Sequence, residues 1–164
     1  MSVFSDFTIT THLPLGTIAI RLLVALFLGA AIGIEREWRN RSAGLRTHML
    51  TSLAAAVFTI LTAEIFHSEL FRDADSRADP IRVIEAVTAG VAFLAAGAII
   101  RGSGGVRGLT TGAGMWLAGA IGVAAGLGQF AIGALAAFLG LVVMYVIGRL
   151  EVVAHDDRTD ESSD

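Results

Sequence analysis

The sequence lacks two residue types that carry much of protein chemistry, since its 164 residues include no cysteine and no lysine. Without cysteine there are no disulfides, thiolate metal sites or thiol nucleophiles, and without lysine there is no Schiff-base chemistry. Charge is scarce as well: 16% of the residues are charged, against roughly 25% in an average soluble domain. Hydrophobic residues make up 54% of the chain. This composition indicates a membrane domain, and the small net charge of −3 predicts no nucleic-acid partner.

Five segments of the sequence are long and apolar enough to form membrane helices, each of which needs about 20 mostly apolar residues. These segments are residues 16–34, 47–66, 81–100, 108–127 and 129–148. The sequence therefore predicts an all-α fold, a polytopic membrane helical bundle with about five transmembrane helices. The predicted transmembrane domain comprises residues 16–150, and its main partner is the lipid bilayer.

Arginine is distributed unevenly between the connections of this bundle. The connections after the first, third and fifth segments, which share one side, carry Arg36, Arg39, Arg41, Arg46, Arg101, Arg107, Arg149 and Arg158. Because basic residues favour the cytoplasmic side of a membrane, we expect the N-terminus outside and the C-terminus in the cytoplasm. Residues 1–15 are then an extracytoplasmic segment. Residues 151–164 are acidic and are expected to form a disordered cytoplasmic tail.

The stretch "IGIEREWRNRSAGLRTHML", residues 32–50, concentrates charge between the first two segments. Two interpretations stay open: the stretch anchors the topology through headgroup contact alone, or it forms a structured cytoplasmic face. Glu35 and Arg39 are four residues apart and can pair along a helix. His48 fits hydrogen bonding near the interface better than metal binding. The expected face, which includes part of the loop over residues 101–116, consists of Glu35, Arg36, Arg39, Arg46, Thr47, His48, Arg107, Thr110 and Thr111.

The third segment begins with "ADPIRVIEAVT", where Asp79 is the expected N-cap of a helix. The next polar residues recur at a spacing of three, which places them on one side of that helix. An ionised Glu85 inside the hydrocarbon would face the bundle and be paired. We interpret this region as a structural ion pair, with a cation or proton path as the alternative. The predicted intramembrane polar cluster consists of Arg21, Glu64, Asp79, Arg82, Glu85 and Thr88.

Small residues recur at every fourth position in the first and fourth segments. Such spacing lets helix backbones approach each other closely in lipid. We expect packing within one bundle, and contacts in a homo-oligomer are the alternative because they use the same physics. The predicted packing residues are Gly29, Gly33, Gly114, Ala118, Gly122 and Gly126.

Three stretches of the chain resemble the ordered signatures of the MgtC/SapB family of bacterial membrane proteins. "GAAIGIEREWRNRSAGLRTHMLTSLAAA" resembles the first signature, in which Ile-Gly-x-Glu-Arg is followed by Ala-Gly-Leu-Arg-Thr-His. "DPIRVIEAVTAGVAFLAAGAII" and "VRGLTTGAGMWLAGAIG" resemble the second and third signatures. The chain departs from the family pattern at Ala92 and Ala95, where glycine is usual, and at Ala86, where glutamine is common. The resemblance covers residues 18–148.

This resemblance implies a multi-pass protein of the bacterial inner membrane. It also implies a part in adaptation to low magnesium or in control of membrane energetics. Longer members of the family have a C-terminal cytoplasmic regulatory domain, and we expect this chain to be a short member that lacks it.

Two functions are compatible with these features. The first is a non-enzymatic protein that regulates ion or magnesium homeostasis through another membrane protein. The second is a small transporter or channel for Mg²⁺ or another cation. Magnesium prefers carboxylates and keeps several waters, but arginines accompany nearly all acids of the segments, which favours regulation. No enzyme and no cofactor other than Mg²⁺ are expected, because the sequence contains no nucleophile–base pair and no metal cluster.

Overall fold

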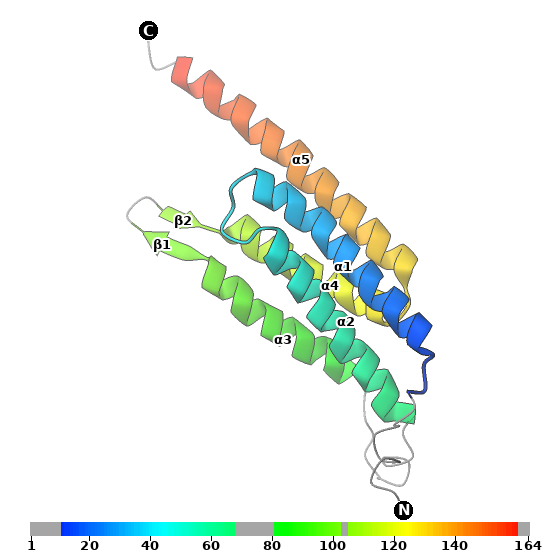
Figure 1. Cartoon of the computed structure of the whole chain (residues 1–164). Helices are drawn as coiled ribbons and strands as arrows, with labels where there is room; N and C mark the ends of the chain where they lie inside the picture. The colour runs from blue at the N-terminus through cyan, green and yellow to red at the C-terminus, as the bar shows by residue number, and fades with distance from the viewer. Residues whose placement is uncertain (1–10, 68–80, 103–104, 161–164) are drawn as a thin grey trace, which may run out of the picture.

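The computed structural model describes residues 11–67, 81–102 and 105–160, which form five helices and one short hairpin (Figure 1). The helices are α1 (Leu15–Trp38), α2 (Leu45–His67), α3 (Ile81–Ala98), α4 (Leu109–Gly126) and α5 (Phe130–Asp160). The prediction of an all-α bundle with five helices is confirmed. By length and composition α1, α2 and α4 can cross a membrane, and residues 130–146 form a shorter apolar stretch of α5.

The central helix of the bundle is α4, which packs against each of the other four helices. The most extensive contacts join α1 to α2 and α2 to α4, whereas α2 and α3 meet over only a few residues. In Figure 1 the α1–α2 connection, the hairpin and the C-terminal part of α5 lie at one end of the bundle. We call this the arginine-rich end, because it carries Arg36, Arg39, Arg41, Arg46, Arg101 and Arg107.

Glycines allow α1, α2 and α4 to approach closely. A methyl group at Gly29 would lie 2.8 Å from both the carbonyl oxygen of His48 and the Cβ of Ser52. At Gly122 the added carbon would overlap the carbonyl oxygen of Ser52, and at Gly126 it would lie 2.8 Å from that of Ala56. These glycines therefore pack inside one bundle, with backbone against backbone.

The remaining predicted packing residues lie on the same contact surfaces. A Cβ at Gly33 would lie 2.7 Å from the Cα of Leu45, and one at Gly114 would lie 3.1 Å from Nε2 of His48. Ala118 is completely buried in α4. Small residues of α1 and of α4 thus line the surfaces with which these two helices contact α2.

A β-hairpin, which the sequence analysis did not predict, joins α3 to α4. Its strands are β1 (Ile100–Gly102) and β2 (Gly105–Arg107), paired antiparallel with Ile100 opposite Arg107. Gly108 follows with φ 90°, a conformation that side chains disfavour, and a Cβ there would overlap the carbonyl oxygen of Ala98. This glycine lets the chain turn directly from the hairpin into α4.

Within the predicted acidic tail, the structure continues α5 as a helix over residues 151–160. The sequence has no proline or glycine between Arg149 and Asp160, so nothing in this stretch breaks a helix that has already begun. Residues 161–164 lie outside the described residues, as do residues 1–10 and the expected N-cap Asp79. The orientation of the termini across the membrane stays a prediction.

Candidate functional site

A buried arginine occupies the arginine-rich end of the bundle. Arg36 lies in the last turn of α1, four residues after the buried Ile32 and therefore on the same inward side of the helix. Only 3% of Arg36 is exposed. Its Nη2 donates a hydrogen bond of 3.3 Å to the hydroxyl of Thr111, in the first turn of α4. The pair ties the end of α1 to the start of α4.

Glu35 pairs with this guanidinium and with that of a second arginine. Its carboxylate lies 3.6 Å from Nη1 of Arg36 and 2.5 Å from Nε of Arg39, the residue one turn further along α1. The side chain of Glu35 is 14% exposed and that of Arg39 is 30% exposed. The predicted pairing of Glu35 with Arg39 is present, and neither carboxylate oxygen has a hydrogen-bond partner among the described residues.

His48 is completely buried in the first turns of α2. Its Nδ1 lies 2.8 Å from the carbonyl oxygen of Gly44, and since a carbonyl can only accept, Nδ1 carries the proton. The other ring nitrogen, Nε2, is buried beside Gly114 and has no hydrogen-bond partner among the described residues. In the neutral ring, Nε2 of His48 therefore carries an unused lone pair inside the bundle, on the helix that follows the helix of Arg36.

The acid Glu37 has a structural role that the sequence analysis did not assign. Its carboxylate accepts a hydrogen bond of 2.9 Å from the backbone N–H of Leu45, the first residue of α2. This contact satisfies one of the donors that a helix start leaves free. A side chain at Gly44 would overlap that carboxylate. The sequence did contain a signal for this role, because an acid lies shortly before "SAGLR", in which Gly44 directly precedes the start of α2.

The other residues of the predicted face lie at the same end but outside the buried cluster. Arg46, Arg107 and Thr110 are exposed, and Thr47 is half-buried. Within the described part of the chain, none of the four side chains forms a hydrogen bond or an ion pair. The structure thus separates an inner cluster, which consists of Glu35, Arg36, Arg39, His48 and Thr111, from an exposed rim.

Among the described residues, which do not include Asp79, the members of the predicted intramembrane polar cluster do not pair with one another. Arg21 donates a hydrogen bond of 2.8 Å to the carbonyl oxygen of Gly126, at the C-terminus of α4. Glu64 accepts hydrogen bonds of 2.6 Å and 2.9 Å from the backbone N–H groups of His12 and Leu13, just before α1. Both side chains therefore satisfy backbone groups near helix ends, which carry free donors and acceptors.

The expectation that Glu85 faces the bundle is also wrong. Glu85 is exposed, and it has no ion-pair partner in the described residues; Arg82 is exposed and Thr88 is half-buried. The buried side of α3 is the apolar one, formed by Val87, Val91 and Ala95. A spacing of three shows that polar residues share a side of a helix, but it does not show which side packs.

No group of three or more histidine and acidic side chains that could hold a metal ion is found in residues 11–67, 81–102 and 105–160. The inner cluster supplies one carboxylate, which two arginines already neutralise. Its chemistry is that of a fixed, buried charge network with one free histidine nitrogen.

The chain is similar to proteins of one family. Residues 22–153 match the model of the MgtC family. "Protein MgtC" of Salmonella typhimurium is 45% identical over 111 residues, which are 68% of this chain and 44% of that protein. "Putative magnesium transporter YhiD" of Escherichia coli K12 is 37% identical over 131 residues, 80% of this chain and 60% of that protein.

The chain spans about half the length of the curated relatives it matches. No solved structure matches it. The family match extends over all five helices, and three of these are apolar enough to cross a membrane. The chain is a membrane protein that belongs to the MgtC family.

Proposed function

We propose that this chain is a non-enzymatic protein of the bacterial inner membrane that regulates ion or magnesium homeostasis through a membrane partner. The partner would contact the exposed rim of the arginine-rich end, which lies in the cytoplasm in this proposal. The inner cluster holds that surface in one shape. No cofactor takes part.

The observation that carries this proposal is the burial of Arg36 between α1 and α4. An arginine is not needed inside a bundle to set topology, because exposed arginines in the connections do that equally well. Burying it requires a partner for its charge, and Glu35 and Thr111 supply the partners. A buried, paired charge fixes the relative position of the two helices and so the shape of the rim above them.

The placement of the acids argues against a path for Mg²⁺ through the described part of the bundle. Glu64 accepts bonds from the backbone before α1, Glu85 faces outward, and Glu35 lies between two arginines. A divalent cation needs carboxylates that line a hydrated space. Along the α2–α4 contact, Gly122 and Gly126 leave no room for one.

The test compares two substitutions that remove the same charge from neighbouring positions. Arg36→Gln removes the buried guanidinium, and Arg41→Gln removes an exposed one from the α1–α2 connection. Both are expressed in a bacterium that lacks its own family member, and growth is measured in low magnesium. We expect Arg36→Gln to lose complementation and Arg41→Gln to keep it, with both proteins present in the membrane at equal levels.

Equal growth of the two variants would contradict the proposal, because the stretch would then act through total charge alone. Glu35→Gln provides a second measurement, since it removes the carboxylate without changing side-chain size. It should behave as Arg36→Gln does, because it leaves the buried guanidinium without its counter-charge.

The second candidate is a small Mg²⁺ transporter, a function that the name of the relative "Putative magnesium transporter YhiD" favours. Purified protein in liposomes that contain a Mg²⁺-sensitive dye separates the two functions. Regulation predicts that wild type and Glu85→Gln show the same background flux. A saturable flux that Glu85→Gln abolishes would establish transport and overturn the regulatory proposal.

A further inference from the structure

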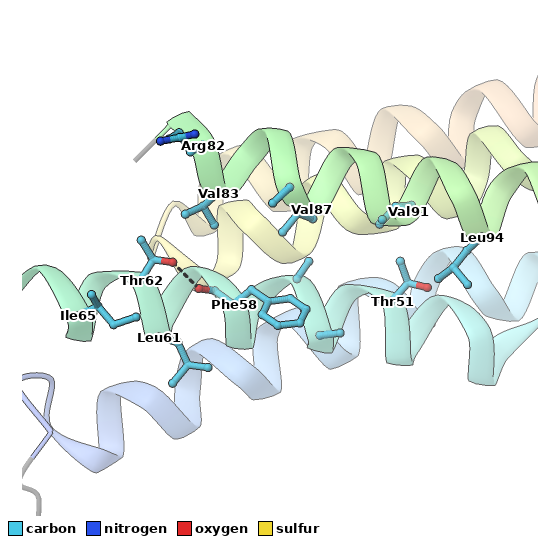
Figure 2. A pocket seen from close by; sticks show the side chains of 14 residues that line it. Thr51, Phe58, Leu61, Thr62, Ile65, Arg82, Val83, Val87, Val91 and Leu94 are labelled. Atoms are coloured by element: carbon cyan, nitrogen blue, oxygen red, sulfur yellow. Dashed lines mark hydrogen bonds between the residues drawn. The ribbon is translucent and has the colours of Figure 1, made fainter. Parts of the chain in front are cut away.

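A long apolar groove lies between α2 and α3, where these helices meet over few residues. Its volume is about 670 Å³. Figure 2 shows Phe58, Leu61 and Ile65 on α2 and Val83 and Val87 on α3 among the side chains that line it. The hydroxyl of Thr62, which also lines the groove, donates to the carbonyl oxygen of Phe58 in its own helix. The walls therefore present hydrocarbon.

One charged side chain lies at the edge of this groove. Figure 2 shows Arg82 at one end, beyond Val83, and Thr51 and Leu94 at the other. Arg82 is exposed and has no hydrogen-bond or ion-pair partner within the described residues. Glu85, one turn further along α3, does not line the groove. The groove thus combines an apolar length with one positive charge at its end, and this charge has no partner in the part of the chain that the structure describes.

The length of the groove matches one leaflet of a bilayer. From Arg82 to Leu94 the chain advances twelve residues along α3, about 18 Å at a rise of about 1.5 Å per residue. Half of a hydrocarbon core about 30 Å thick is about 15 Å.

A second apolar cavity of about 440 Å³ adjoins the groove at Thr62 and Val83, which line both. It extends towards Val123 and Leu127 near the end of α4. The two spaces begin at the same end of the bundle as Arg82. Together they fit a ligand with one charged group and two hydrocarbon chains.

We propose that the groove between α2 and α3 is a binding site for a phospholipid with an anionic headgroup. One acyl chain occupies the groove, and the headgroup lies against the guanidinium of Arg82. The charge of Arg82 selects the headgroup, while the valine and leucine side chains of α3 select only for hydrocarbon. The site does not depend on whether the protein regulates a partner or transports an ion.

Native mass spectrometry of the purified full chain in detergent tests this site. Phosphatidylglycerol and phosphatidylethanolamine with identical acyl chains are added in equal amounts. Wild type should bind phosphatidylglycerol about fivefold better, the effect of one arginine near a membrane surface. Arg82→Gln should lose this preference and Arg82→Lys should keep it. The matched control is Arg107→Gln, which removes an exposed arginine at the opposite end of the bundle and should behave as wild type.

A second variant tests the acyl-chain site without changing charge. Gly90 lines the groove and has open space beside it, so Gly90→Leu fills the groove without a clash and should weaken binding of both lipids. Equal binding of the two lipids by wild type, or a preference that survives Arg82→Gln, would overturn the proposal. A wild-type dimer that Gly90→Leu dissociates would overturn it as well, because a second copy would then fill the groove.

Discussion

α2 contacts its neighbours in two different ways. Towards α1 and α4 it packs against glycines, and it buries Ser52, Ala55 and Ala56 in that contact. Towards α3 it leaves a groove, although α3 also contains glycines: Gly90 and Gly97 have nothing within 4 Å of an added Cβ. Glycine content therefore does not determine close packing. A glycine must lie opposite the backbone of a neighbour, because lipid is as apolar as the protein interior and offers no other drive for association.

The largest expected effect comes from filling the closed contact. Gly122→Leu forces a side chain into the carbonyl oxygen of Ser52 and the Cβ of Ala55, and we expect a loss of roughly 3 kcal/mol or more. Gly97→Leu is the control, since it adds the same side chain to open space on α3. Thermal unfolding in detergent measures both. Equal melting temperatures would mean that a neighbouring backbone opposite the glycine does not decide the effect.

A smaller effect is expected from emptying a closely packed contact elsewhere in the bundle, where Ile121 of α4 packs against Ile32 of α1 and Ala137 of α5. Ile121→Ala removes a fully buried side chain of α4 and should cost about 2 kcal/mol, the lower end for such changes, because only packing is lost in lipid. Ile65→Ala removes the same atoms from the groove, where 47% of the residue is exposed, and should leave the melting temperature nearly unchanged. Similar losses at both positions would contradict the comparison.

Two adjacent threonines of α4 sharpen the comparison at the arginine-rich end. Thr111→Val removes the hydroxyl that accepts from Arg36, and we expect a loss of about 1.5 kcal/mol, as for a hydrogen bond to a charged group. Thr110→Val changes the exposed neighbour and should have no effect on unfolding. A loss at Thr110 equal to that at Thr111 would indicate that threonine acts through helix propensity instead.

The smallest effect is expected at Ser52, whose hydroxyl donates to the carbonyl oxygen of Ala25 across the α1–α2 contact. Ser52→Ala should cost about 0.6 kcal/mol, the average for hydrogen bonds between membrane helices. Thr62→Val, which removes a hydroxyl bonded within its own helix, should cost less. Reversal of this order, measured by the same melting experiment, would show that the inter-helix bond adds nothing.

The inner cluster could be predicted only in part. The spacing of Glu35 and Arg39 indicated their pairing, and the concentration of arginines indicated the end where they lie. The partner of Arg36 could not be read from the sequence, because Thr111 is 75 residues away and reaches it only through the packing of α1 on α4. For the same reason Thr110 and Thr111, which look equivalent in the sequence, differ completely in exposure.

Arg21, Glu64 and Glu85 show why the rest could not be predicted. The sequence predicted that these charges pair with one another, but Arg21 and Glu64 bind backbone groups instead. Every helix end leaves free donors or acceptors, and a sequence does not reveal which charged side chain will come near them. The hairpin and the helical extension of α5 were missed because neither changes the hydrophobic pattern that marks a membrane segment.

The sequence by itself determined the five helices, the arginine-rich end and the family, because these follow from composition, spacing and motif order along the chain. Only the tertiary structure decided which glycines make contact, which side of α3 packs, and which groups bind the guanidinium groups of Arg36 and Arg21. These depend on the rotation and height of each helix relative to its neighbours. Helix periodicity determines neither the rotation nor the height of a helix. Both are set where backbones meet at Gly29, Gly122 and Gly126.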